Sequence, residues 1–147
     1  MSELATTINA VLKKKRGDIW TVSPDASVYQ CVEVMAEKEV GALLVMEDGD
    51  LAGVISERDY ARKVILQGRS SKETMVREIM SSPAICVSAE HTVGDCMLIM
   101  TKNRIRHLPV RAGSKVVGVV SIGDLVNWII TEQEEKIRHL EAYICGQ

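Results

Sequence analysis

The chain carries little net charge and has no long apolar run. Its 147 residues include 18 lysines and arginines against 20 aspartates and glutamates, a formal net charge of −2. This balance argues against a nucleic-acid binder, which would need a broad basic face. The longest apolar run, Val116–Ile122, is far shorter than the roughly 20 residues of a membrane-spanning helix. In the opening stretch MSELATTINAVLKKKR the charges follow the apolar part, the reverse of a secretory signal, so we expect a cytoplasmic protein.

Residues that hold metals or form disulfides are scattered. No two cysteines form a C-x-x-C pair; they are Cys31, Cys86, Cys96 and Cys145. We interpret them as reduced thiols, three of them among apolar residues, and consider only Cys145, near the C-terminus, for reactivity. The histidines are equally isolated, so we expect no metal site; they are His91, His107 and His139.

The sequence also lacks the short motifs that commonly carry catalysis. It contains no Gly-x-Ser-x-Gly elbow, no Walker loop, no Gly-x-Gly-x-x-Gly and no paired acids with a nearby base. We therefore expect no enzymatic activity and no catalytic cofactor.

What the chain does contain is an internal repeat. GVISERDY at residues 53–60 returns as GVVSIGDL at residues 118–125, and residues 21–65 align with residues 86–130 without a gap. The identical pairs include Gly53/Gly118, Ser56/Ser121 and Asp59/Asp124. A match over a whole supersecondary unit indicates a true duplication.

Each copy predicts the same order of elements. Short β-rich segments, IWTV and AICV, precede Ser23 and Ser88, which we expect as N-caps. Apolar residues then recur at i, i+3, i+4 and i+7 from Val28 and from Val93, a pattern typical of amphipathic helices. Two apolar runs around the polar turns EDGD and AGSK predict a hairpin, and a second helix starts after Ser56 and Ser121. The unit is βαββα, twice.

We therefore predict an α+β fold in which two βαββα repeats pack with approximate two-fold symmetry. One copy is too small to bury both faces of its sheet and its helices, so we expect the two copies to pack together. The expected segments are an N-terminal segment 1–17, the first repeat 18–67, a linker 68–80, the second repeat 81–131 and a C-terminal helical extension 132–147.

The last helix is predicted to continue past the repeat with an apolar stripe. Ile130, Ile137 and Ile144 lie seven residues apart, with Val126 and Leu140 beside them. The pattern covers fewer than four heptads, so it does not support an extended coiled coil. Docking onto its own domain and dimerisation both remain open.

The repeat resembles a tandem pair of CBS domains, the module named after cystathionine β-synthase. The resemblance rests on VREIM before the second copy, RHLPV in its hairpin, the doubled Gly-x-x-Ser-x-x-Asp, and the stretches VGALLV, SERDYARK and SIGDLV, which are similar to stand-alone bacterial CBS proteins. It covers residues from about 11 to 130. It implies a regulatory, dimerising module that binds AMP, ADP, ATP, S-adenosylmethionine or NAD in clefts between the repeats.

The resemblance also implies site residues. The ribose-binding acids would be Asp59 and Asp124, and their hydroxyl partners Ser56 and Ser121. The backbone bordering adenine would be Thr21, Val22, Cys86 and Val87. The strand start that reaches phosphate would be Arg106 and His107, and the two motifs add Pro109 and Gly123.

On the residues alone, Ser-x-x-Asp at a helix start is also a capping box. In this motif the serine hydroxyl accepts a hydrogen bond from an early helix amide, and the acid side chain reaches back to the serine. The two roles can coexist, because a carboxylate that only accepts hydrogen bonds suits the two donors of a ribose diol. We expect Arg58 and Arg106 to hold phosphates, although both could be solvated surface residues. His107 could equally be a packed strand residue. We expect the basic run 13–16 to be a solvated helix end rather than a patch that attracts phosphate.

The expected function is an energy or metabolite sensor, with AMP the first candidate ligand. A ligand that joins the repeats would shift their orientation, and an unknown effector protein would read the change. The alternatives are a protein-interaction scaffold with empty clefts and a thiol redox sensor that uses Cys145 or Cys31.

Overall fold

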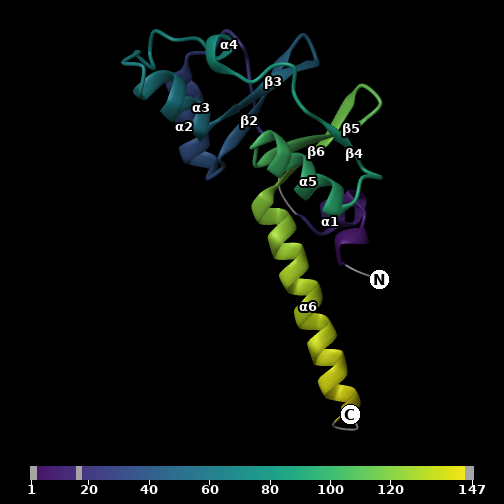
Figure 1. Cartoon of the computed structure of the whole chain (residues 1–147). Coiled ribbons are helices and arrows are strands. Elements are labelled where there is room, and N and C mark those ends of the chain that lie inside the picture. Colours follow the sequence, from purple (N-terminus) through teal and green to yellow (C-terminus); the bar gives the residue numbers. More distant parts are fainter. Residues whose placement is uncertain (1–2, 16–17, 145–147) are drawn as a thin grey trace. The chain divides into compact units, whose positions relative to one another are not determined.

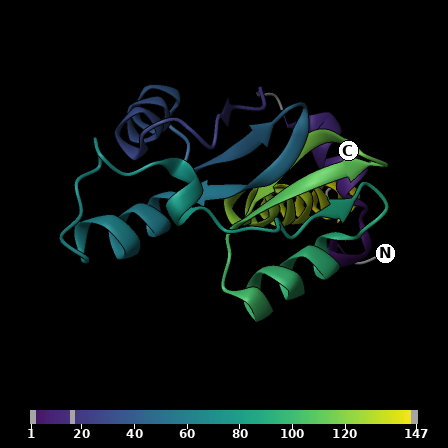
Figure 2. The same cartoon turned by 90° about the horizontal axis from the view of Figure 1, so that it is seen from above.

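The computed structural model describes residues 3–15 and 18–144, which divide into two units. The first-repeat unit comprises residues 18–85 and 113–116, and the second-repeat unit comprises residues 3–15, 86–112 and 117–144. Each unit is built around one three-stranded sheet with helices beside it (Figures 1 and 2). The predicted α+β class with two copies of a βαββα repeat is therefore confirmed.

The first-repeat unit follows the predicted order of strand, helix, hairpin and helix. Its sheet has the order β1-β2-β3, in which β1 runs parallel to β2 and β3 antiparallel to it. Its second helix is short, because α3 gives way to a π-helical turn, η2. The elements are β1 (Thr21–Val22), α2 (Val28–Lys38), β2 (Ala42–Glu47), β3 (Asp50–Ser56), α3 (Glu57–Tyr60), η2 (Ala61–Ile65) and α4 (Val76–Ile79).

The second-repeat unit has the same sheet order, β4-β5-β6, with β4 parallel to β5. It adds an N-terminal segment and a long last helix to the repeat. The elements are η1 (Glu3–Ala5), α1 (Ile8–Lys14), β4 (Val87–Ser88), α5 (Val93–Asn103), β5 (His107–Ala112), β6 (Lys115–Ser121) and α6 (Ile122–Ile144).

The apolar spacing of the first helix in each repeat produces the buried face that the sequence predicts. Each helix buries three side chains that are at most 4% exposed: Val28, Cys31 and Met35 in α2, and Val93, Cys96 and Met100 in α5. Burying one such side chain is worth about 1.5–3 kcal/mol relative to leaving it in water. These residues form the centre of each hydrophobic core.

The N-caps of these helices differ from the prediction. We expected Ser23 and Ser88, but the caps are Ser27 and Thr92. Ser27 and Thr92 each form a capping box with the side chain three positions on, which satisfies two backbone amides at once. Ser23 and Ser88 make hydrogen bonds inside the preceding loop instead. The reciprocal pair of bonds explains why the later residue is the cap.

Two short segments complete the cores from outside the aligned repeats. Ile8 and Val11 of α1 are buried in the core of the second-repeat unit, and Val76 and Ile79 of α4 in that of the first. The N-terminal segment and the linker therefore have the same structural role, one in each unit.

The glycine of each repeated motif lies on the last strand of its repeat and allows a neighbouring segment of the chain to approach that strand closely. A Cβ atom on Gly53 would lie 2.6 Å from the backbone oxygen of Ser81, and one on Gly118 would lie 2.8 Å from Cδ2 of Leu12. Real Cβ atoms do not approach other atoms so closely, so a side chain at either position would force a neighbouring atom to move, which is harder for the Ser81 backbone than for the end of the Leu12 side chain.

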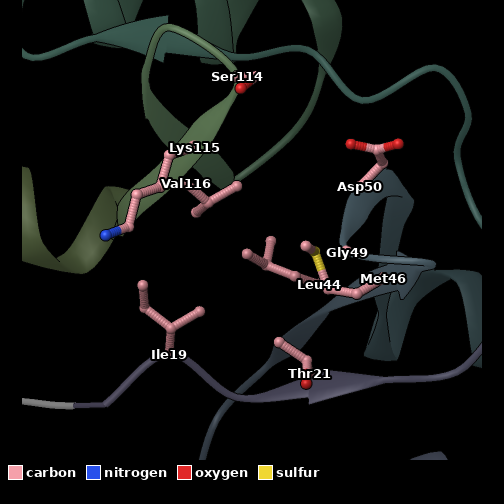
Figure 3. A pocket seen from close by; sticks show the side chains of 9 residues that line it. All are labelled: Ile19, Thr21, Leu44, Met46, Gly49, Asp50, Ser114, Lys115 and Val116. Atoms are coloured by element: carbon pink, nitrogen blue, oxygen red, sulfur yellow. The ribbon is translucent and has the colours of Figure 1, made fainter.

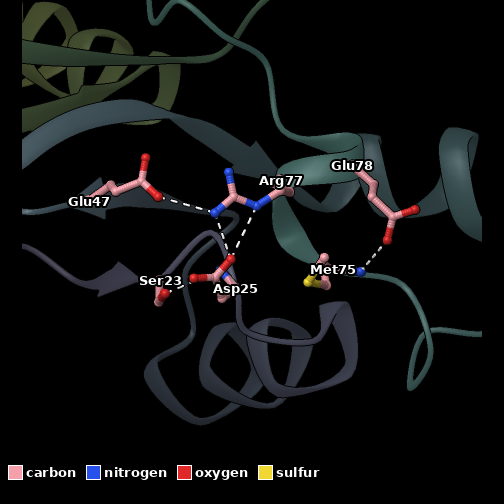
Figure 4. A network of polar contacts seen from close by, with 6 residues as sticks. All are labelled: Ser23, Asp25, Glu47, Met75, Arg77 and Glu78. Carbon is pink, nitrogen blue, oxygen red and sulfur yellow. Dashed lines mark hydrogen bonds and ion pairs between the residues drawn. The ribbon is translucent and has the colours of Figure 1, made fainter.

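Ion pairs at the surface tie α4 to the rest of the first-repeat unit (Figure 4). Arg77 lies 2.6 Å from Asp25 and 3.1 Å from Glu47, and the hydrogen bond to Asp25 is the main cause that raises the pKa of Arg77. The amide of Met75 donates to Glu78 over 2.7 Å. These groups are well exposed, so we assign them to orientation more than to stability.

The last helix, α6, is the longest element. It spans 23 residues, and of its described side chains only Leu125 is fully buried. Figure 1 shows its C-terminal half continuing beyond α1 and α5 of the same unit. Among residues 3–15 and 18–144, no helix is long and apolar enough to cross a membrane.

Candidate functional site

The repeated Ser-x-x-Asp lies where the last strand of each repeat meets the next helix. The Asp59 carboxylate accepts from the Ser56 amide at 2.9 Å, and Ser56 Oγ accepts from the Asp59 amide at 3.2 Å. In the second copy the corresponding distances between Ser121 and Asp124 are 2.8 and 3.1 Å. The capping-box interpretation is therefore confirmed in both copies.

Each junction borders the first residue of the hairpin. The amide of Glu57 donates to the Gly41 carbonyl over 3.0 Å, and the amide of Ile122 donates to the Arg106 carbonyl over 2.8 Å. Arg106 therefore lies beside the second motif, and its side chain is exposed. The first copy has a glycine at this position, so it brings no basic side chain to the same place.

In the first-repeat unit a lysine binds the motif aspartate. Lys63 Nζ lies 3.3 Å from Asp59 Oδ1 and donates to the Ile79 carbonyl over 2.9 Å. Lys63 follows Asp59 by four residues on the same helical stretch, a spacing that brings opposite charges together. The Asp59 side chain is only 13% exposed.

In the second-repeat unit a lysine from the N-terminal segment takes the same place. Lys15 Nζ donates to Asp124 Oδ2 over 2.8 Å and to the Val119 carbonyl over 2.6 Å. Burial raises the pKa of Asp124, but the hydrogen bonds from Lys15 and from the Ser121 amide outweigh it and leave the pKa below its usual value. Asp124 is therefore an ionised acceptor at neutral pH.

Sequence reasoning missed both lysines as parts of these sites. We expected the basic run 13–16 to be a solvated helix end, yet Lys15 binds Asp124, and Lys14 lies 4.9 Å from the Trp128 ring centroid. Arg16 lies outside the described residues. The spacing of Lys63 from Asp59 was a usable signal, whereas nothing in the sequence linked Lys15 to a residue 109 positions away.

His107 begins β5 beside this ion pair. Burial, followed by the positive charges of Lys15 and Arg106, lowers the pKa of His107, while the Asp124 charge opposes the shift. His107 is therefore a neutral, half-buried side chain near neutral pH and could offer a hydrogen bond without carrying charge.

The other predicted residues differ in what they expose. Val87 is buried in the core and Pro109 is also buried, so only their backbones could border a ligand. Val22 and Cys86 are half-buried. The exposed ones are Thr21, Arg58 and Gly123.

A hollow of about 320 Å³ lies within the first-repeat unit beside Thr21 (Figure 3). The side chains of Ile19, Leu44 and Met46 give it an apolar lining. Lys115 adds a positive charge on one side of it (Figure 3). Its volume lies at the lower end of the range for small-molecule sites. Thr21 is the only predicted site residue that lines it.

The described cysteines are free thiols in or near the cores. Burial raises the pKa of Cys31 to about 12 and that of Cys96 to about 11, so neither is a ready thiolate. Cys86 is half-buried, and Cys145 lies outside the described residues. Among residues 3–15 and 18–144 no group of three or more His, Cys, Asp or Glu side chains could hold a metal ion.

Comparison with known proteins finds one family. The family model described as "CBS domain" matches twice, at residues 10–65 and at residues 76–131.

Among relatives, the CBS domain-containing protein CBSX3, mitochondrial, of Arabidopsis thaliana is 44% identical over 97% of this chain and 73% of its own length. The CBS domain-containing protein YhcV of Bacillus subtilis is 34% identical over 71% of this chain and 74% of its own. A solved structure from Burkholderia ambifaria, described as a candidate signal-transduction protein with CBS domains, is 48% identical with a TM-score of 0.84, covering 87% of this chain and 96% of that one.

Proposed function

The chain belongs to the CBS domain family, and on this premise we propose that it is a sensor of an adenosine-containing ligand. CBS pairs are generally regulatory modules that bind adenosine ligands. AMP is our first candidate, followed by ADP, ATP, NAD and S-adenosylmethionine. We further propose that the protein acts in the cytoplasm, forms a homodimer and signals to an effector protein.

The observation that carries this proposal is the pair of aspartate–lysine contacts. Asp124 accepts a hydrogen bond from the Lys15 ammonium, and Asp59 forms an ion pair with the Lys63 ammonium. Each ammonium also donates to a backbone carbonyl. A ribose 2′,3′-diol presents the same chemistry, two adjacent donors toward a carboxylate. The diol would take the place of the lysine on each aspartate.

The groups around each motif suit the rest of a nucleotide. The N-terminus of α6 leaves backbone amides without helical partners, and Arg106 lies at the same edge, so both attract phosphate. In the first-repeat unit, Arg58 follows Ser56 and is exposed. Near Thr21, the apolar side chains of Ile19 and Met46 offer a surface on which a purine could pack.

The size of the ligand bounds the affinity. AMP has about 23 heavy atoms, and at roughly 0.3 kcal/mol each the binding free energy is about −7 kcal/mol, or a Kd of about ten micromolar. That range suits a reporter of cellular nucleotide concentration.

The test uses matched capping boxes. Calorimetry and thermal unfolding with AMP, ADP, ATP, NAD and S-adenosylmethionine are compared for the wild type, Asp124→Asn, Asp59→Asn and Asp95→Asn. Asp95 closes the capping box of α5 with Thr92 and has no proposed ligand contact, so its variant changes only the cap, from which it removes the charge. Since a hydrogen bond to a charged group is worth about 1.5–3 kcal/mol, we expect Asp124→Asn and Asp59→Asn each to weaken binding about tenfold or more.

Equal losses in all three variants would mean that the aspartates act only through helix stability. A wild type that binds none of the five compounds would overturn the sensor and favour a second candidate, a protein-interaction scaffold. That candidate is supported by the exposed apolar stripe of α6. A redox sensor that uses Cys31 is disfavoured, because this thiol is fully buried and its pKa is raised to about 12.

A further inference from the structure

The last helix presents an apolar stripe that its own unit leaves uncovered. The stripe residues are exposed by 42% to 73%, and no other described residue packs them into a core. They are Val126 (42%), Ile130 (50%), Ile137 (57%), Leu140 (60%) and Ile144 (73%).

The side of α6 that faces its own unit is a different one. Lys14 reaches Trp128, with 4.9 Å to the ring centroid, and Glu132, at 3.4 Å. Glu3 lies 2.6 Å from Lys136, and Leu125 is buried in the core. At 3.6 residues per turn these contacts lie between about a quarter and almost half of a turn away from the centre of the apolar stripe. The stripe therefore remains available while the first half of the helix is docked.

The spacing of the stripe is that of a helix pair. In a heptad register, the three a positions are all isoleucine: Ile130, Ile137 and Ile144. The d positions are Val126, Gln133 and Leu140. β-branched residues at a with leucine at d favour two parallel strands. A single polar residue in the seam, here Gln133, fixes the register at some cost in stability.

The flanking charges select the orientation. Glu134 and Glu141 occupy two of the three e positions between residues 126 and 144, and Lys136 occupies a g position. In a parallel pair, Lys136 lies next to Glu141 of the second copy, which is an attractive contact. In an antiparallel pair the e positions face each other, so glutamates would oppose glutamates. Lys136 is 60% exposed beside Glu3 and has three N–H donors, so one ammonium can serve both carboxylates.

We propose that α6 pairs with α6 of a second copy of this chain as a parallel, in-register, two-stranded coiled coil over residues 126–144. This inference rests on the proposed homodimer and names the surface that forms it. It does not depend on the identity of the ligand.

The first test measures the molar mass of the full chain in solution by analytical ultracentrifugation over a range of micromolar concentrations. We expect a dimer for the wild type and a monomer for Ile137→Glu/Leu140→Glu, whose glutamates stand in the seam. The matched control is His139→Glu/Ala142→Glu, which adds two glutamates to the same turns on the opposite side of the helix and should remain a dimer. Far-ultraviolet circular dichroism checks that all three chains keep their helix.

The possible outcomes bear differently on this inference and on the proposed homodimer. A dimeric wild type with a dimeric seam variant would show that another surface joins the copies, which overturns this inference and leaves the homodimer standing. A monomeric wild type at all concentrations would overturn both. A seam variant that is monomeric but still binds AMP would support this inference and show that ligand binding does not need the pair.

The second test measures orientation. In a Cys145→Ser background, Ile144→Cys places a thiol at an a position near the end of the helix. A parallel in-register pair brings the two thiols together, so mild oxidation should link most of the protein covalently. An antiparallel pair would leave them about 27 Å apart, given 1.5 Å per residue over 18 residues, and no link would form. Absence of a link in a dimeric protein would overturn the parallel arrangement.

Discussion

Both repeats contain the same contact between the motif aspartate and a lysine, but the two lysines come from different places in the chain. In each, the motif aspartate caps a helix and binds an ammonium that also donates to a backbone carbonyl. Lys63 is local, four residues from Asp59, and is fixed by the helix that carries both. Lys15 is 109 residues from Asp124 and reaches it only because α1 packs on the second-repeat unit.

This difference gives the two aspartates different consequences. Releasing Lys63 frees one side chain, whereas releasing Lys15 removes a tether of the N-terminal segment. Under the proposed function, a ribose on Asp124 would therefore loosen the end of α1, and a ribose on Asp59 would not. Under this proposal, ligand binding to the second-repeat unit would be linked to the position of another segment.

The largest expected effect concerns the two motif glycines. A Cβ atom at residue 53 meets the backbone oxygen of Ser81, which cannot move alone, while one at residue 118 meets a flexible end of the Leu12 side chain. We expect Gly53→Ala to lower the free energy of unfolding by about 2–3 kcal/mol and Gly118→Ala by about 1 kcal/mol or less, as overpacking costs about 1–3 kcal/mol. Urea denaturation of both variants measures this. Equal losses would show that both segments are equally rigid.

The lysines provide the next comparison. Lys15→Met and Lys63→Met keep an unbranched side chain and remove the charge. Exposed and half-exposed ion pairs are worth about 0.2–1 kcal/mol, so we expect a small loss of stability in each. We also expect Lys15→Met to tighten AMP binding about two- to fivefold, because the ribose no longer competes with an ammonium. Calorimetry measures the affinity and the number of sites.

A weaker affinity in Lys15→Met would reverse the interpretation. It would mean that the ammonium turns to the phosphates when the ligand binds, and so acts as a ligand contact. Equal changes in Lys15→Met and Lys63→Met would remove the difference between the two repeats.

The local features of these sites could be predicted from the sequence, and the tertiary ones could not. Periodicity identified the buried faces around Val28 and Val93, and the Ser-x-x-Asp spacing identified both capping boxes. These depend on residues at most seven positions apart. The Lys15 contact, in contrast, depends on where α1 packs, and no local pattern encodes that position.

The N-cap error has a related physical reason. Ser23, Ser27, Ser88 and Thr92 are all residues that favour caps, and the choice between them depends on which one has an acidic or amide side chain three positions on. Gln30 and Asp95 supply that partner for the later residue in each copy. Testing each candidate for the second half of the box would have selected Ser27 and Thr92.

The smallest expected effect belongs to a residue that only the second-repeat unit has. His107 aligns with Ala42 in the first copy, and its pKa lies below the usual 6.5. Between that lowered pKa and pH 6.5, the unfolded chain binds more protons than the folded one. The stability contributed by neutral His107 is therefore fully present above pH 6.5 and is lost as the pH falls through this window.

His107→Ala should remove this dependence and make the second-repeat unit resemble the first. We expect the melting temperature of the wild type to fall more steeply from pH 7 to pH 5 than that of His107→Ala. The slope is the quantity to compare, because the alanine also removes packing at every pH. Parallel slopes would mean that His107 takes up a proton as readily when folded as when unfolded, and that the positive charges of Lys15 and Arg106 are screened from its ring.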